Sequence, residues 1–286
     1  MADPIINPIA DPLVELPDVS PTSQLVDIDA TLEGAVTVTM VRPERRNAFD
    51  AGLISALDEA FKDLAGAEGV RVIFLRGAGG TFSAGADLDW MRSAVDSSEA
   101  ANREDAMALA RMLKQLWDLP ALTVALVEGA AFGGGAGLVA ACDMAIATRD
   151  ARFSFSEVKL GLIPATVSPY VVAAIGPRAA RAFFATGRVF DAQEAQQIGL
   201  VSEVAADATA LEAVQARIAR DILACAPGAV ADAKQLAMDV FGREIDHGLL
   251  EETARRIAAA RVGDEGQEGV RAFLERRKPA WMQGGD

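Results

Sequence analysis

Histidine is scarce in this sequence, since His247 is the only one among 286 residues. A histidine-based metal site needs several such ligands, so we expect no metal of that kind. The two cysteines, Cys142 and Cys225, form no CxxC pair, which excludes a disulfide framework and fits a reducing compartment. A Ser-His-Asp triad would have to use His247. That residue lies at an expected helix start, and we interpret it as a capping or surface residue.

Positively charged side chains are also few, since the sequence has 27 Lys and Arg but 41 Asp and Glu, which gives a net charge of −14. A surface of that sign repels nucleic acid and anionic membranes. No run approaches the roughly 18 apolar residues that a membrane span needs, and no basic start leads into an apolar segment as in a signal peptide. We therefore expect a cytoplasmic protein with no nucleic-acid partner and no membrane partner.

Three regions differ in their residue pattern. Residues 1–25 hold five of the twelve prolines, and because proline removes backbone donors we expect a disordered tail. Residues 26–205 alternate strand patterns with amphipathic helices, such as the helix that Asp50 would cap, which predicts an α/β core with a largely parallel sheet. Residues 206–286 show only helical apolar stripes and predict a helical C-terminal region, with helices at 209–223, 228–241, 246–260 and 266–275.

Two glycine-rich turns follow two buried strands of the expected sheet. The turn Gly77–Asp87 follows Val70–Leu75, and the turn Glu128–Gly137 follows Leu122–Val127. Neither turn contains a Walker loop, a complete GxGxxG or a GxSxG, so the usual nucleotide and hydrolase motifs are absent. Glycines ahead of a helix let a ligand approach unpaired amides, and two converging amides form an oxyanion hole. The same residues suit two tight turns with close packing equally well.

Taken in order, the segments Arg42–Ala48, Phe82–Leu88 and Glu128–Asp143 resemble the crotonase superfamily, the enoyl-CoA hydratases and isomerases. Supporting segments extend the resemblance over residues 30–280. It implies an α/β fold of β-β-α spiral turns with a helical C-terminal trimerisation region, assembled as a homotrimer or a dimer of trimers. The substrate it implies is an acyl-CoA, so coenzyme A enters as part of the substrate and we expect no separate cofactor.

By motif position, the resemblance assigns the thioester oxygen to the backbone amides of Ala84 and Gly134. Segments 45–48 and 84–87 would line the CoA. Arg42 joins Arg45 and Arg46 as candidate phosphate partners, since a guanidinium makes charge-assisted bonds to phosphate, although a solvated turn explains all three equally well. Lys278 would reach CoA from a neighbouring subunit. The full set of CoA-binding candidates is Arg45, Arg46, Ala48, Ala84, Gly85, Ala86, Asp87, Gly134 and Lys278.

Hydratases of this family carry two glutamates, of which this sequence has one. The position of the first, two residues after the glycine triplet, is Gly137 here. The second is Glu157, and its apolar neighbours Phe155 and Val158 would desolvate it and raise its pKa toward a range useful for proton transfer. Asp143 is an alternative acid, for which we favour a structural role.

A single glutamate leaves two reactions open. In a hydratase, Glu157 would take a proton from the water that attacks Cβ, and the proton would return to Cα. In a Δ3–Δ2 isomerase, Glu157 would move one proton between C2 and C4. The segment Gly161–Gly176 looks like the bacterial methylglutaconyl-CoA hydratase-like group of leucine and terpenoid breakdown, which favours a hydratase. A catalytically silent acyl-CoA-binding paralogue is the third hypothesis, motivated by Gly137.

Overall fold

The computed structural model describes residues 24–31 and 33–282. The tail expected over residues 1–25 lies almost entirely outside these ranges, so that prediction stays a prediction. The main sheet has six strands in the order β1-β2-β3-β4-β6-β9. β1 (Val26–Ala30) pairs antiparallel with β2 (Ala35–Met40), and every other neighbouring pair is parallel. The expected parallel sheet is therefore present, with one antiparallel edge strand that the sequence pattern did not indicate.

The burial of side chains along the strands follows their residue patterns. In β2 the side chains of Val36, Val38 and Met40 are buried in alternation with the threonines, as the period-two pattern predicts. The central strands β3 (Val72–Gly77) and β4 (Leu122–Val127) are almost wholly buried, because helices cover both faces of a parallel sheet. β6 (Met144–Thr148) and β9 (Glu203–Ala205) complete the sheet.

A second, smaller sheet carries the segments that form the candidate site. β5 (Ala130–Phe132) runs parallel to β7 (Arg152–Ser154), and β7 pairs antiparallel with β8 (Phe190–Asp191). β5 comes directly before α4 (Gly134–Ala141), and β7 leads toward the short 3-10 helix η3 (Glu157–Leu160). The two parallel strands thus bring a glycine-rich turn and Glu157 to the same edge.

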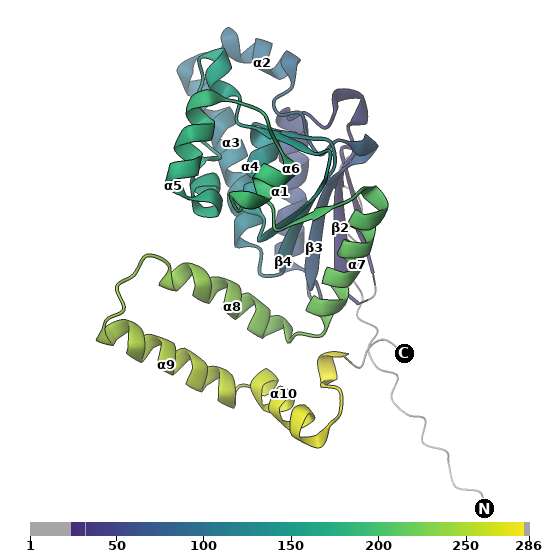
Figure 1. Cartoon of the computed structure of the whole chain (residues 1–286), viewed down its shortest axis with the longest axis vertical. Coiled ribbons are helices and arrows are strands. Elements are labelled where there is room, and N and C mark those ends of the chain that lie inside the picture. Colours follow the sequence, from purple (N-terminus) through teal and green to yellow (C-terminus); the bar gives the residue numbers. More distant parts are fainter. Residues whose placement is uncertain (1–23, 32, 283–286) are drawn as a thin grey trace, which may run out of the picture.

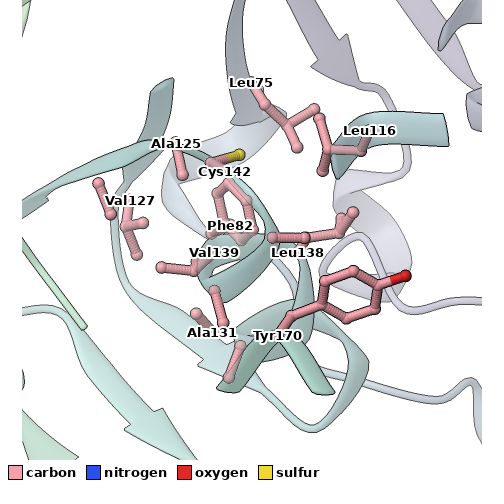
Figure 2. Close-up of a cluster of buried hydrophobic side chains, with 14 of the residues drawn as sticks. Leu75, Phe82, Leu116, Ala125, Val127, Ala131, Leu138, Val139, Cys142 and Tyr170 are labelled. Atoms are coloured by element: carbon pink, nitrogen blue, oxygen red, sulfur yellow. The ribbon is translucent and has the colours of Figure 1, made fainter. Parts of the chain in front are cut away.

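Helices pack on the main sheet from both sides. α1 (Ala51–Gly66) begins after Asp50, whose carboxylate accepts a hydrogen bond from the Leu53 amide, so the predicted cap is confirmed. α2 (Leu88–Val95), α3 (Glu99–Asp118), α4, α5 (Ser168–Thr186) and α6 (Ala192–Gln197) lie on one side (Figure 1). Figure 2 shows the centre of this core, where Phe82 and side chains of β3, β4, α3 and α4 meet.

The C-terminal helices separate into two groups. α7 (Ala208–Leu223) buries Leu211 and Ile218 against the other face of the sheet and so belongs to the core. α8 (Pro227–Val240), α9 (His247–Val262) and α10 (Asp264–Glu275) extend away from it (Figure 1). All four predicted helices are present, with ends within two residues of the predicted ones. His247 is the exposed first residue of α9 and Asp246 provides the cap, so the histidine is a surface residue.

Over the ranges 24–31 and 33–282, we find no helix with the length and apolar character to cross a bilayer.

Candidate active site

Three segments that are distant in sequence lie side by side at the candidate site. The Ser83 amide donates to the Ala130 carbonyl at 2.8 Å, and the Phe132 amide donates to the Ser83 carbonyl at 3.0 Å. The Gly133 amide then donates to the Ser154 carbonyl at 2.9 Å. These bonds join both glycine-rich turns to the segment that ends at Glu157. The structure therefore brings together the two turns and the glutamate that the sequence singled out.

The Glu157 carboxylate lies over the second glycine turn. Its Oε1 is 3.1 Å from the position that a Cβ on Gly133 would take. Its Oε2 is buried and has no hydrogen-bond partner among the described residues. Burial raises the pKa of Glu157 above its ordinary value, and the hydrogen bond to its own backbone lowers it by less. A carboxyl in such surroundings exchanges protons with a neighbouring ligand more readily than an exposed one at neutral pH.

The N-terminus of α4 faces the same place. Gly133 caps this helix with φ +49° and ψ −117°, a backbone conformation that favours glycine. The Gly134 amide has no acceptor among the residues that the structure describes, and the helix dipole favours negative charge beside it. The Phe49 ring closes the other side, because a Cβ on Gly134 would lie 3.1 Å from its Cδ2. Gly134 therefore presents a free amide, and a side chain at this position would press on the Phe49 ring.

Ala84 does not offer the second amide, which corrects the prediction from the sequence. The Ala84 N–H donates to the Arg46 carbonyl at 2.9 Å and is therefore already engaged within the chain. Arg46 adopts a left-handed backbone conformation with φ +52°, which turns that carbonyl toward the loop. The motif was placed correctly, but the orientation of consecutive amides in an irregular loop cannot be inferred from residue types.

Ala86, two residues further on, has the free amide. Phe49 donates to the Gly85 carbonyl at 2.7 Å and Asp87 donates to the Phe49 carbonyl at 2.8 Å. In this short parallel bridge the amide between those two partners turns away from Phe49. Within ranges 24–31 and 33–282 the Ala86 N–H has no acceptor, and Ala86 is exposed. A Cβ on Gly85 would lie 3.9 Å from the Gly133 nitrogen, which places this turn beside the N-terminus of α4.

Arg42 is not available to a phosphate group. Its guanidinium contacts Asp50 Oδ2 at 2.9 Å and Asp87 Oδ2 at 3.0 Å, and donates to the Ala48 carbonyl at 2.7 Å. Its candidate role in CoA binding is therefore wrong, because all of these contacts are internal. The Asp87 side chain is also engaged internally, since it caps α2 through Asp89 and Trp90, so only its backbone remains at the CoA-lining segment.

The remaining CoA-binding candidates differ in where the structure places them. Arg45 and Arg46 are exposed, and Arg45 lies 3.2 Å from the Asp89 carboxylate. Ala48 is buried and offers its carbonyl to Arg42. Lys278 is exposed and follows α10 in the sequence, and α10 lies at the opposite end of the molecule from α2 (Figure 1).

Asn47 is a site residue that the sequence analysis did not single out. It is fully buried in a left-handed conformation with φ +52°, which asparagine tolerates better than most residues. Its side chain accepts from the Arg42 amide and donates to the Ala78 and Thr81 carbonyls. It thereby holds the loop before α1 against the first glycine turn. The sequence did contain a signal for this role, since Asn47 stands directly before two apolar residues that are buried.

Gly137, where a second glutamate would stand, is tightly enclosed. A Cβ at this position would lie 2.2 Å from Val167 Cγ1 and 2.7 Å from Val167 Cβ. Val167 thus fills the space into which a side chain at position 137 would project. The missing carboxylate is replaced by an apolar contact between α4 and the start of α5.

Asp143 has a structural role, as favoured from the sequence. Its carboxylate accepts from the amide and hydroxyl of Thr123 at 2.8 Å each, and pairs with Lys234 of α8 at 2.6 Å.

A cavity of about 940 Å³ lies beside the pair of Asp143 and Lys234, between α8 and the ends of α3 and α4. Apart from Asp143, none of the candidate site residues lines it. Among the described residues, no three or more His, Cys, Asp or Glu side chains gather where a metal ion could be held.

Comparison with known proteins shows which family the chain resembles. The family model for Enoyl-CoA hydratase/isomerase matches residues 31–284. "Enoyl-CoA hydratase ACTT6" of Alternaria alternata is 36% identical over 253 residues, which cover 87% of this chain and 82% of that protein. "Enoyl-CoA isomerase/hydratase fer4" of Mycosarcoma maydis is 34% identical and covers 88% of this chain and 94% of its own.

A solved structure shows the same fold at similar identity. The enoyl-CoA hydratase from Shewanella pealeana superposes with a TM-score of 0.86 at 38% identity, covering 90% of this chain and 96% of the other. Both glycine-rich turns and Glu157 lie within residues 31–284, which the family model matches. The chain therefore belongs to the enoyl-CoA hydratase/isomerase family of the crotonase superfamily.

Proposed function

We propose that this protein is an enoyl-CoA hydratase that adds water across the 2,3 double bond of an enoyl-CoA thioester. The observation that carries the proposal is the Glu157 carboxylate, whose buried Oε2 has no hydrogen-bond partner among the described residues and which lies beside the N-terminus of α4 and the free Gly134 amide. The names of the similar proteins, most of which are hydratases, support the same reaction.

The two free amides would stabilise the negative charge that develops on the thioester oxygen. A thioester oxygen placed between the Ala86 and Gly134 N–H groups gains negative charge as the enolate forms. One such donor contributes on the order of 3 kcal/mol to transition-state stabilisation. The positive end of the α4 dipole acts in the same direction.

Glu157 supplies the proton transfer. As a carboxylate it takes a proton from water while the water oxygen bonds to C3, and the π electrons move onto the thioester oxygen as an enolate. The enolate collapses, C2 takes the proton from Glu157, and the carboxylate is restored. One carboxylate suffices for this cycle, because the same group accepts and returns the proton.

The exposed Arg45 and Arg46 are proposed partners for the CoA phosphates, since they are accessible cations beside segment 84–87. Lys278 would contribute only from another subunit, in a homotrimer or a dimer of trimers. The C-terminal region supports such an assembly, because large apolar side chains on its helices and on the loop after α8 are 73% to 82% exposed. These side chains are Phe241, Ile245, Val262, Phe273 and Leu274.

The Gly137–Val167 contact favours a second candidate, a Δ3–Δ2 enoyl-CoA isomerase. With Val167 in the place of a carboxylate, the side chain beside Gly137 cannot hold a water by charge. Glu157 alone can move a proton between C2 and C4 through a dienolate, whose oxygen would be held by the same two amides. The substrate we propose for the hydratase is a branched enoyl-CoA such as methylglutaconyl-CoA.

Mass spectrometry in heavy water separates these reactions. A panel of 2-enoyl- and 3-enoyl-CoA esters, including methylglutaconyl-CoA, is incubated with the wild-type enzyme and with Glu157→Gln. Gain of one heavy water by a 2-enoyl ester, lost in the variant, is the expected result. Deuterium incorporation with a shifted double bond and no added water would identify the isomerase. An unchanged panel with CoA ester still bound would overturn both and identify a silent binder.

A further inference from the structure

The Arg42 side chain lies beside the proposed oxyanion hole, and its contacts are with groups of this chain. Its Nη2 lies 2.9 Å from Asp50 Oδ2 and 3.0 Å from Asp87 Oδ2, while Nη1 donates to the Ala48 carbonyl at 2.7 Å. Only 13% of the Arg42 side chain is exposed. A buried arginine shared by two carboxylates is costly unless all its partners are fixed, so its placement is tightly determined.

Each of the two carboxylates divides its oxygens between a helix and Arg42. Asp50 Oδ1 accepts from the Leu53 amide at 2.8 Å and caps α1, while its other oxygen pairs with the guanidinium. Asp87 Oδ1 accepts from the Asp89 amide at 2.8 Å and caps α2, and its other oxygen also pairs with the guanidinium. One side chain thereby locks together the N-termini of two helices.

Phe49, which precedes the cap Asp50, contacts the segments that carry both proposed oxyanion donors. Phe49 precedes Asp50 and forms the bridge to Gly85 and Asp87 that orients the Ala86 amide. The Phe49 ring lies against Gly134, where the second donor is. Any shift of the segment 48–50 relative to Asp87 therefore changes the direction of one amide and the packing of the other.

We propose that Arg42 is a positioning residue for the oxyanion hole, which it orients by joining Asp50, Asp87 and the Ala48 carbonyl through one guanidinium. The inference rests on the proposed function, because it takes Ala86 and Gly134 as the donors to the thioester oxygen. Lysine cannot replace this arrangement fully, since an ammonium lacks the planar fork that serves three acceptors at once.

The test uses a readout that a purely structural arginine would not affect. Butyryl-CoA labelled with ¹³C at its carbonyl has no double bond to hydrate, and its carbonyl stretch moves to lower wavenumber when the oxygen accepts strong hydrogen bonds. Infrared difference spectra are recorded on saturated wild-type enzyme, Arg42→Met, Arg42→Lys and Asp50→Asn. Asp50→Asn keeps a good helix cap and removes only the charge pair, so it tests the link even if Arg42→Met folds poorly.

The expected result is a loss of at least half of the wild-type carbonyl shift in Arg42→Met, with an intermediate shift in Arg42→Lys and Asp50→Asn. Turnover of the best enoyl-CoA should fall about 10- to 100-fold in kcat, the cost of a misplaced catalytic group, with a change in substrate Kd below about 3-fold. The matched control is Arg217→Met, which removes another arginine bridging two carboxylates, Glu203 and Asp221, far from the site. It should keep both the shift and kcat.

Two results would overturn the inference in distinguishable ways. If wild-type enzyme shifts the carbonyl stretch and the folded variants at Arg42 and Asp50 do so equally, Arg42 only stabilises the fold. If wild-type enzyme itself leaves the stretch of bound butyryl-CoA unchanged, the assignment of Ala86 and Gly134 as donors fails and the role of Arg42 fails with it.

Discussion

The carboxylate of Glu157 is placed by a glycine, because its Oε1 lies 3.1 Å from where a Cβ on Gly133 would be. Packing against this bare backbone turn brings the carboxylate to the N-terminus of α4 without a hydrogen bond to its buried Oε2. The group is therefore both close to the proposed oxyanion donors and free to exchange a proton. Its reactivity has a cost, since an unpartnered buried carboxylate opposes folding.

Replacing Glu157 with glutamine should abolish turnover while keeping the fold. Glutamine has nearly the same shape and cannot take up or return a proton at neutral pH. We expect kcat to fall about 10²- to 10⁴-fold, the usual contribution of a general acid–base group, with little change in acyl-CoA affinity. Steady-state kinetics and isothermal titration with butyryl-CoA check both parts. Near-normal turnover would exclude Glu157 as the acid–base group.

The same substitution should stabilise the protein at neutral and alkaline pH. Burial raises the pKa of Glu157 in the folded state, so its ionisation weakens folding as the pH rises through that pKa. Below the pKa of the unfolded chain the carboxyl is neutral in both states, and glutamine then offers no gain. Thermal melts of both proteins from about pH 4 to about pH 9 span the titration of a carboxyl group. The melting temperatures should diverge as the pH rises, with the variant melting at the higher temperature. An equal melting temperature at every pH would contradict the assigned burial.

The two alanines of the first glycine turn should respond oppositely to removal of a single N–H. Substituting L-lactate for alanine replaces the amide with an ester, which deletes that donor and weakens the preceding carbonyl as an acceptor. At Ala86 we expect kcat to fall about 10²- to 10³-fold, since this amide is free for the substrate. At Ala84 we expect the free energy of unfolding to fall by about 0.5–1.5 kcal/mol while kcat is kept, because this amide donates to the Arg46 carbonyl. Exchanged outcomes would restore Ala84 as the oxyanion donor.

Position 137 should tolerate a side chain only if Val167 is removed. A Cβ there would lie 2.2 Å from Val167 Cγ1, so Gly137→Ala should cost about 1–3 kcal/mol through overpacking. Val167→Gly vacates that space, and the double variant should be more stable than the sum of the two single effects predicts. A double-mutant cycle by urea unfolding measures this coupling. Additive effects would show that the backbone relaxes around the contact instead.

Much of the fold could be predicted from the sequence because it depends on periodicity. The alternation of Val36, Val38 and Met40, the cap at Asp50 and the apolar stripes of the four C-terminal helices are local patterns that burial rewards directly. The antiparallel strand β1 was not predicted. Its alternate residues carry acidic side chains at an exposed edge, which resembles a polar loop until its partner strand is known.

The site was predicted in its residues but not in its hydrogen bonds. Glu157 and Gly134 were placed by motif, and the structure brings them together. The choice between the Ala84 and Ala86 amides depends on which carbonyl each N–H meets, and that is set by the left-handed backbone at Arg46 and Asn47. Arg42 was misassigned for a related reason, since its pairing with Asp50 and Asp87 depends on how the loop before α1 and the first glycine turn fold together.

Lys234 should prove to be the attachment point of the extended C-terminal helices. Its ammonium pairs with Asp143 at 2.6 Å and donates to the Leu119 and Ala121 carbonyls at 2.7 Å each, which fixes α8 to the core. Lys234→Met keeps the length of the side chain but leaves these acceptors unpaired. We expect the free energy of unfolding to fall by about 1–3 kcal/mol, and amide hydrogen exchange to speed up in α8 more than in β4.

Lys62→Met is the control for this prediction, because Lys62 forms an exposed pair with Asp58 one turn away on α1, and such pairs contribute less than about 1 kcal/mol. Exchange in α8 should be unchanged in that variant. Equal exchange in α8 for wild type and Lys234→Met would mean that contacts other than this ammonium hold the helix. Faster exchange confined to α8, α9 and α10 would show that these three helices open as one unit while α7 stays with the sheet. The packing of Leu211 and Ile218 of α7 against the sheet indicates the same division.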